Sequence, residues 1–226
     1  MLASLLAGVA QAATPAAWVP TTPTQCTLEG WTTDRDPAGL NVRAAPSAQA
    51  AIVGTLPAFE ANTQLTRTSR FSIKGSANGW LRIDGGADYR VSDVPDDWPD
   101  RPAYAGAGWI SGRHAGFAVQ SARGYARPDA SAAKLIDLKG DWLTDLGKID
   151  RVVACSGDWA LLDFHLEHRR DGDRLADLSA REQSASKARA WFRGTCAMLE
   201  TTCDQPDPDG GSDASPQTAP TTNGGG

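Results

Sequence analysis

Short stretches of alternating or β-branched apolar residues, separated by turn residues, recur along the whole chain. They predict strands at residues 40–43, 51–56, 62–68, 71–73 and 80–83 in the first half, and at 134–138, 149–155 and 159–164 in the second. Asn78-Gly79 is a strong hairpin signal, and Ser156-Gly157-Asp158 occupies the matching place between two later strands. Five or six short strands within about 80 residues predict a small antiparallel barrel in each half.

Two longer segments interrupt this pattern. Residues 85–106 contain three prolines and repeated aspartates, which predicts an exposed loop rather than a strand. Residues 165–189 are highly charged, and the stretch 177–189 favours a short helix. Beyond Cys203 the chain is dominated by Asp, Pro, Gly, Ser and Thr, so residues 204–226 are predicted to be disordered. The inward positions of the first barrel are expected to be Val42, Ile52, Val53, Leu56, Leu65, Leu81, Ile83 and Ile110.

The two halves are related by a weak internal repeat. Residues 46–56 align without gaps with residues 128–138. Trp80 then aligns with Trp159, and Trp109 with Trp191, in the same order along the chain. Three ordered matches indicate two copies of one module, at residues 26–112 and 115–203.

The first copy carries a recognisable series of motifs: GLNVRAAPS at 39–47, IVGTL at 52–56, NGWLRI at 78–83 and GWIS at 108–111. This series resembles the bacterial SH3-like (SH3b) domain. The second copy is degenerate, since LNVR has become RGYA at 123–126 and Ala190 replaces the glycine before the final tryptophan. The resemblance implies an all-β protein with two small SH3-like antiparallel barrels in tandem, similar to exported proteobacterial proteins. It also places Asp34 and Arg43, which belong to its motif region, among the candidate ligand-binding residues.

The N-terminal residues predict export. Residues 2–9 are apolar or small, and Ala10-Gln11-Ala12 fits the small-x-small rule of a cleavage site, so residues 1–12 are predicted to be a signal peptide. The basic n-region is missing or truncated, because the first basic residue is Arg35. No cysteine follows the apolar stretch, which argues against a lipid anchor. The expected location is periplasmic or secreted.

Four cysteines and no C-x-x-C motif suggest two disulfides, for which three connectivities exist. Cys196 and Cys203 are close in sequence and follow the last predicted strand, so we expect them to pair. By elimination, Cys26 then pairs with Cys155, which requires the two modules to touch.

Charge and hydropathy exclude two classes of partner. The chain has 22 Lys and Arg against 27 Asp and Glu, a net charge of −5. Four of these acids lie in the predicted tail, at Asp204, Asp207, Asp209 and Asp213, so the body is close to neutral and no nucleic acid is expected as partner. No apolar stretch approaches the roughly 20 residues that span a membrane. A hydrophobic content of 41% with eight tryptophans supports a folded core.

The sequence offers no arrangement typical of catalysis or of a cofactor. Asp163, His165, Glu167 and His168 cluster, but the neighbouring arginines favour a solvated charged surface over a metal site. The cysteines are expected to be oxidised, and neither a G-x-S-x-G motif nor a phosphate-binding or dinucleotide fingerprint occurs. We therefore expect a protein that is not an enzyme and needs no cofactor.

Aromatic residues are the remaining candidates. Trp80 and Trp159 each open a strand after a tight turn, where an indole can stack on a sugar or a proline-rich peptide, although packing in the barrel also explains them. Tyr89, Trp98 and Tyr104 in the long loop extend this candidate surface, whereas Trp109 is expected to pack inside. The predicted function is a non-catalytic cell-envelope binding module for peptidoglycan or a partner peptide; a regulatory or structural partner of an envelope enzyme is the alternative.

Overall fold

The computed structural model describes residues 16–61, 66–91, 99–167 and 188–197. The predicted signal peptide at 1–12, most of the predicted helix at 177–189 and the predicted disordered tail at 204–226 lie outside these residues. The described chain is built mainly of strands, which confirms the all-β class. Its helical segments are α1 (Leu143–Leu146) and the short 3-10 turn η1 (Gly112–His114).

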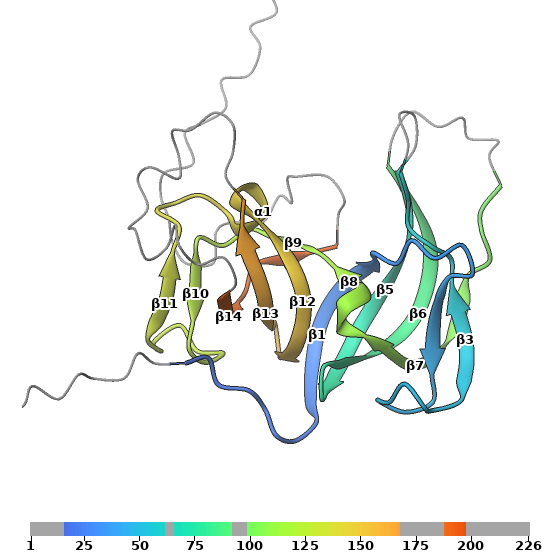
Figure 1. Ribbon diagram of the computed structural model, residues 1–226, viewed down its shortest axis with the longest axis horizontal. Coiled ribbons are helices and arrows are strands. Elements are labelled where there is room, and N and C mark those ends of the chain that lie inside the picture. The colour runs from blue at the N-terminus through green and yellow to red at the C-terminus, as the bar shows by residue number, and fades with distance from the viewer. Residues whose placement is uncertain (1–15, 62–65, 92–98, 168–187, 198–226) are drawn as a thin grey trace, which may run out of the picture.

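The first sheet is antiparallel and strongly curled (Figure 1). Its strand order is β3-β2-β7-β6-β5-β1-β8, and β4 pairs with β5 off this path. The strands are β1 (Thr24–Thr32), β2 (Leu40–Arg43), β3 (Ile52–Leu56), β4 (Glu60–Ala61), β5 (Thr66–Ala77), β6 (Trp80–Val91), β7 (Tyr104–Ser111) and β8 (Ala115–Gly116).

The second sheet has the order β11-β10-β14-β13-β12 and lies beside the first (Figure 1). Its strands are β10 (Arg123–Tyr125), β11 (Lys134–Asp137), β12 (Gly147–Ser156), β13 (Trp159–Leu166) and β14 (Ala188–Phe192). Two short strands, β9 (Ala118–Val119) and β15 (Thr195–Cys196), pair with each other outside both sheets.

Five strands of the first sheet and the five of the second share one topology. The order β3-β2-β7-β6-β5 corresponds strand by strand to β11-β10-β14-β13-β12. The register also agrees, since Arg43 faces Trp109 in the first sheet and Tyr125 faces Trp191 in the second. The irregularities of the long hairpin recur as well, at Arg70/Ser72 and Ile73/Gly75 in the first sheet and at Ile149/Arg151 and Val152/Ala154 in the second. Residues aligned by the sequence repeat therefore occupy equivalent ladder positions.

The predicted hairpin turn at Asn78-Gly79 connects β5 to β6, and both residues have positive φ, 52° and 78°. This geometry is the one that a two-residue turn between right-twisted strands requires. In the second sheet Gly157, with φ of 59°, occupies the corresponding turn between β12 and β13.

Strand β1, which the sequence did not predict, joins the two halves. It pairs with β5 and β8 within the first sheet. It also reaches the β12–β13 turn, where Gly157 N–H donates to Gln25 O at 2.9 Å and Thr27 N–H donates to Gly157 O at 2.8 Å. The predicted disulfide between Cys26 and Cys155 is present at the same place, with Cα atoms 5.8 Å apart. Cys196 is also disulfide-bonded, but its predicted partner Cys203 lies outside the described residues.

One hydrophobic core runs through both halves and includes residues of both sheets. Five of the eight predicted inward residues are fully buried: Val42, Leu56, Leu81, Ile83 and Ile110. The prediction is wrong for Ile52 and Val53, which are 55% and 49% exposed. A register shift between Val42 and Arg43 places Ile52 opposite outward-facing Arg43 and leaves Val53 without a direct partner on the edge strand β3. Leu65 lies outside the described residues.

The prediction of a loop over residues 85–106 is wrong at both ends. β6 continues to Val91 and β7 begins at Tyr104. The extension forms because residues 66–70 of β5 provide a partner for residues 87–91. The prolines are confined to the connection after Val91, so they do not interrupt the ladder. Tyr89 and Tyr104 therefore lie on strands.

Candidate functional site

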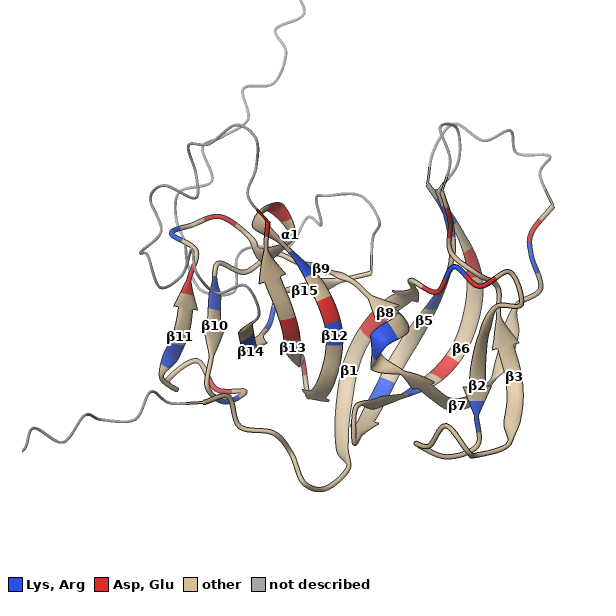
Figure 2. Cartoon of the chain, in the orientation of Figure 1, with Lys and Arg blue, Asp and Glu red and all other residues tan. Residues whose placement is uncertain are grey.

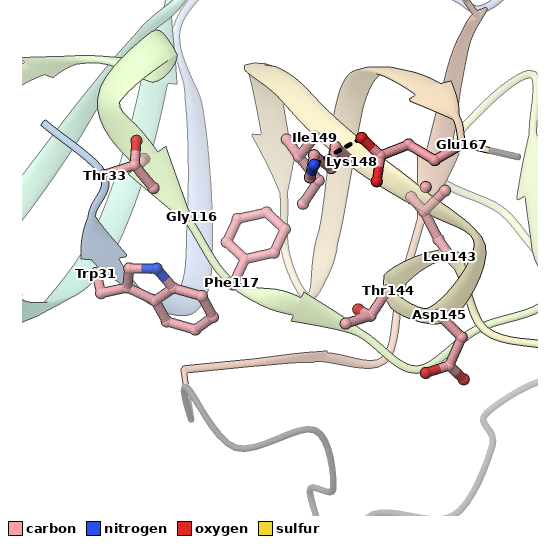
Figure 3. A pocket seen from close by; sticks show the side chains of 12 residues that line it. Trp31, Thr33, Gly116, Phe117, Leu143, Thr144, Asp145, Lys148, Ile149 and Glu167 are labelled. Atoms are coloured by element: carbon pink, nitrogen blue, oxygen red, sulfur yellow. Dashed lines mark hydrogen bonds and ion pairs between the residues drawn. The ribbon is translucent and has the colours of Figure 1, made fainter. Parts of the chain in front are cut away.

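The two halves enclose a groove of about 580 Å³ at their junction (Figure 3). The end of β1 and the strand β8 contribute one wall, whereas α1 and the start of β12 contribute the other. The lining residues are Trp31, Thr33, Ala115, Gly116, Phe117, Leu143, Thr144, Asp145, Gly147, Lys148, Ile149 and Glu167.

Trp31 is the large aromatic residue on the first wall. It is paired across the ladder with Gly116 and is only partly buried. A Cβ atom at residue 116 would lie 2.9 Å from Trp31 Nε1 and 2.7 Å from Thr33 Cγ2. Gly116 therefore leaves the space that this indole needs beside β8, and an aromatic face remains available to the groove.

The floor of the groove is apolar. Phe117 is 3% exposed and lies between Trp31 and the opposite wall in Figure 3. Leu143, the first residue of α1, is buried, and Ile149 packs against the same core. Such a floor removes apolar ligand surface from water and supplies most of the affinity of a binding groove.

Charged groups line the second wall. Lys148 Nζ lies 2.6 Å from Glu167 Oε1, and this hydrogen bond holds the pKa of Glu167 below its usual value. Glu167 is also fixed through its backbone, because its N–H donates to Leu146 O at 2.8 Å. Asp145 adds a further carboxylate from α1. The groove thus combines an apolar aromatic floor with one ammonium group and two carboxylates on its rim.

The charged cluster that the sequence analysis weighed as a metal site is held by ion pairs. Asp163 accepts two hydrogen bonds from Arg189, at 2.6 and 2.9 Å, and His165 Nδ1 lies 2.9 Å from Asp150 Oδ1. Glu167 pairs with Lys148, and His168 lies outside the described residues. Within the described ranges no group of three or more His, Cys, Asp or Glu is placed to hold a metal ion.

Trp80 and Arg43, two predicted site residues, lie on the outer face of the first sheet and not in the groove. Arg43 faces Trp109 across the ladder, and Trp109 faces Arg82, so these three side chains form one row. Trp80 lies two residues before Arg82 in β6, so both side chains are on the same face of the strand. Trp80 and Trp109 are both partly buried, and Arg82 is exposed. The expectation that Trp109 packs inside is wrong, because the register directs Gly108 and Ile110 inward instead.

Trp159, the equivalent of Trp80, lies in a packed cluster. It is 8% exposed and makes an edge-to-face contact with Tyr125, at a centroid distance of 5.5 Å. The Arg193 guanidinium lies over the Trp159 ring, 5.3 Å from its centroid. Trp191 belongs to the same cluster and is stacked on Trp18 at 6.0 Å. A segment N-terminal to β1 therefore covers the outer face of the second sheet.

The remaining predicted site residues are dispersed. Arg70 lies over the Tyr89 ring at 5.7 Å, and Tyr104 donates a hydrogen bond from its hydroxyl to Ala107 O at 3.1 Å. Asp34 lies near His114, 3.7 Å from its Nδ1. Trp98 lies outside the described residues. The structure brings Trp80 and Arg43 onto one face and does not join Tyr89, Tyr104 or Asp34 to them.

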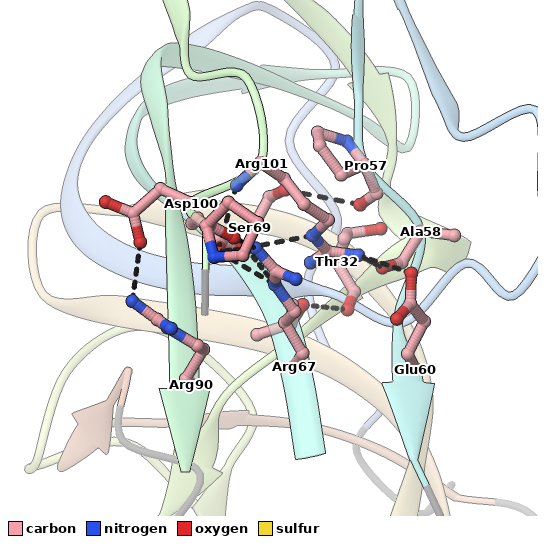
Figure 4. A network of polar contacts seen from close by, with 12 residues as sticks. Thr32, Pro57, Ala58, Glu60, Arg67, Ser69, Arg90, Asp100 and Arg101 are labelled. Atoms are coloured by element: carbon pink, nitrogen blue, oxygen red, sulfur yellow. Dashed lines mark hydrogen bonds and ion pairs between the residues drawn. The ribbon is translucent and has the colours of Figure 1, made fainter. Parts of the chain in front are cut away.

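A buried ion cluster secures the connection between β6 and β7 (Figure 4). Asp88, whose side chain is 3% exposed, accepts hydrogen bonds from Arg67 at 2.8 Å and from Arg101 at 2.9 Å. Burial raises the pKa of Asp88, but these hydrogen bonds outweigh it and hold the pKa below its usual value. Arg67 also donates to Pro99 O at 2.7 Å, and Arg101 donates to Ala58 O at 2.6 Å. Each guanidinium of this cluster pairs with Asp88, although Arg101 Nη2 is buried without a hydrogen-bond partner among the described residues, so we interpret the cluster as one that fixes the chain.

The groove residues Trp31 and Phe117 were missed by the sequence analysis. Both lie in segments that flank the repeated motifs, and neither belongs to a repeat match. One signal pointed to this region: the predicted Cys26–Cys155 bridge places the segment after Cys26 beside the second half.

Basic and acidic residues are interspersed over both sheets (Figure 2). In the described part of the chain no helix is long and apolar enough to cross a membrane. No protein-family model matches the chain, and no curated protein or solved structure is significantly similar to it.

Proposed function

We propose that this protein is a non-catalytic binding protein of the bacterial cell envelope, composed of two SH3-like modules that recognise peptidoglycan. Two observations support the modular part of this proposal. The sequence motifs at 39–47, 78–83 and 108–111 resemble the SH3b domain, and the two five-stranded units have the same strand order and register. The Cys26–Cys155 disulfide favours an oxidising compartment, in keeping with the predicted signal peptide.

The groove at the junction is the observation that carries the proposed function. A volume of about 580 Å³ accommodates a short oligosaccharide or peptide segment. Trp31 supplies an aromatic face for the apolar side of a sugar ring, and Lys148 with Glu167 supplies partners for hydroxyl, amide or charged groups. Peptidoglycan presents both kinds of surface, because it consists of glycan strands and short peptides.

The test is co-sedimentation of the purified protein with isolated sacculi. Trp31→Ala removes the aromatic wall and is expected to reduce binding at least tenfold, because central aromatic residues dominate binding energy. Trp109→Ala is the matched control, since it truncates another partly buried tryptophan outside the groove. Equal binding by the wild type and Trp31→Ala, with both proteins folded by circular dichroism, would exclude the groove as the peptidoglycan site.

A second candidate function is docking to an envelope enzyme as a structural or regulatory partner. The outer face of the first sheet favours it, because Trp80, Trp109, Arg43 and Arg82 share this face. Partly buried tryptophans beside arginine on an outer face are typical of protein interfaces. Crosslinking in the native envelope with a photoreactive residue at position 82 separates the two functions. Docking to a protein partner would be favoured if residue 82 crosslinks to a protein and the groove variants still bind sacculi.

A further inference from the structure

A second cavity, of about 240 Å³, lies where three parts of the chain meet. The segment before β1 contributes Thr22, the β5–β6 turn contributes Asn78, and the outer face of the second sheet contributes Arg151 and Arg189. No Asp or Glu side chain lines it among the described residues. The cavity is separate from the groove, with which it shares no lining residue.

The Arg151 side chain lines this cavity, and one of its hydrogen-bond donors has no acceptor. Its Nε is buried and has no hydrogen-bond partner among the described residues. Leaving a buried donor of a charged group without an acceptor costs stability, so native proteins rarely keep one without a reason. Because Nε is itself buried, a ligand in the cavity would accept hydrogen bonds from the terminal nitrogens of this guanidinium, whose side chain lines the cavity.

The position of Arg151 is fixed by the neighbouring turn. A Cβ atom at residue 79 would lie 1.6 Å from Arg151 Nη2, so the guanidinium lies directly against the Gly79 backbone. Gly79 also has a φ of 78°, which other residues rarely adopt. The arginine side chain is therefore placed by packing rather than by an ion pair.

The cavity has an excess of positive charge. Arg151, Asp163 and Arg189 are cross-strand neighbours on β12, β13 and β14. Arg189 uses two nitrogens to bind Asp163, at 2.6 and 2.9 Å, and these hydrogen bonds raise the pKa of Arg189. One carboxylate thus stands between two guanidinium groups, and the charge of Arg151 is left uncompensated in this row.

We propose that this cavity binds an organic carboxylate, with Arg151 as the main donor and Asn78 and Thr22 as additional hydrogen-bonding groups. Guanidinium groups match the planar geometry of a carboxylate and can donate two parallel hydrogen bonds to it. The volume is several times the roughly 30 Å³ that one water molecule occupies in the liquid, so it has room for a carboxylate with a short side chain. Val153 and Ala154 provide apolar contacts for that side chain. This proposal is independent of the peptidoglycan proposal.

The experiment is a titration of the ¹⁵N-labelled full chain in low-chloride buffer with three probes: N-acetylalanine, its uncharged amide N-acetylalaninamide, and inorganic phosphate. We expect N-acetylalanine to shift the Arg151 Nε–H resonance in a saturable manner, and the amide to leave it unchanged. Failure of N-acetylalanine to shift this resonance would overturn the proposal, and so would an equal response to the amide. A stronger response to phosphate would reassign the site to inorganic anions.

Variants then locate the binding. Arg151→Gln is expected to weaken N-acetylalanine binding at least tenfold while leaving the melting temperature of the free protein unchanged or higher, because the unsatisfied donor is gone. Arg113→Gln is the matched control, since Arg113 is exposed and lies outside the cavity. Undiminished binding by Arg151→Gln would contradict the proposal. Should that variant not fold, the wild-type resonance titration decides alone.

Discussion

The outer faces of the two sheets differ in their side chains although their backbone ladders agree. On the first sheet Trp109 lies in a row between Arg43 and Arg82. On the second sheet Trp191 lies between Tyr125 and Leu161 at the equivalent positions. The second row is buried, and the first is partly open to solvent.

Trp18, which lies N-terminal to β1, explains why three large apolar side chains can occupy the second row. Trp18 stacks on Trp191, and Trp191 Nε1–H donates to Trp18 O at 2.8 Å. The backbone of Trp18 is held in turn by its N–H, which donates to Ala126 O at 2.8 Å. The outer face of the second sheet is therefore buried in an apolar cluster of its own, whereas the equivalent face of the first sheet carries Arg43 and Arg82. The same backbone ladder therefore carries a buried outer face in one half and a partly open one in the other.

The largest effect that this comparison predicts is on stability. Trp191→Ala is expected to lower the free energy of unfolding by about 3–5 kcal/mol, because it empties a fully buried site. Trp109→Ala at the equivalent position is expected to cost less than half as much. Urea denaturation of both variants measures the difference. Similar losses would show that the face of the first sheet is packed as tightly as that of the second.

The next largest expected effect is the loss of stability on removing the Cys26–Cys155 disulfide, which links the two halves. Replacing Cys26 and Cys155 together by alanine is expected to cost roughly 2–5 kcal/mol, since the bridge closes a loop of 129 residues. Thermal unfolding of the double variant under non-reducing conditions provides the value. A single transition at an unchanged temperature would mean that the shared core holds the two sheets together without the bridge.

Trp18→Ala sharpens the comparison further, because it removes the covering ring and leaves the backbone hydrogen bonds possible. Loss of the stacked contact is expected to destabilise the protein by about 1 kcal/mol. Hydrogen exchange of the Trp191 indole N–H should become faster, whereas that of Trp109 should not change. Unchanged exchange at Trp191 would indicate that the residues beneath Trp18 exclude water by themselves.

The smallest effect is a pH dependence confined to the first sheet. The lowered pKa of Asp88 means that its stabilisation is present above the ordinary value of 3.8 and is lost as pH falls through the lower value of the folded protein. On acidification below this range, the indole signal of Trp109 should change before that of Trp191, and Asp88→Asn should abolish the difference. NMR titration of the two indole N–H groups tests this order.

Most strands were predictable because their information is local. Alternation at 80–83 and the Asn78-Gly79 turn define the hairpin without reference to the rest of the chain. Strand β1 was not predictable in this way, since its inward residues include Gly30 and Thr32, which weaken the hydrophobic alternation. The extension of β6 depended on its partner β5, and neither proline content nor charge revealed that pairing.

The groove was less predictable than the fold. Trp31 and Phe117 meet Lys148 and Glu167 only because β1 pairs with β8 beside the start of β12. Such an arrangement depends on contacts between residues far apart in sequence, and comparing motifs within one module cannot predict them. The two aromatic residues that motif comparison did select, Trp80 and Trp159, occupy equivalent positions with different environments.

The path of the N-terminal segment has a consequence for how the chain reaches its native state. Trp18 is linked to Trp191 across 173 residues, and Cys26 to Cys155 across 129. Because this segment is synthesised first, it must remain unpaired until nearly the whole described chain has left the ribosome. Long-range pairing of this kind slows folding, because loop closure precedes any stabilising contact. We expect the second sheet to acquire its protected outer face late, after synthesis of the chain is complete.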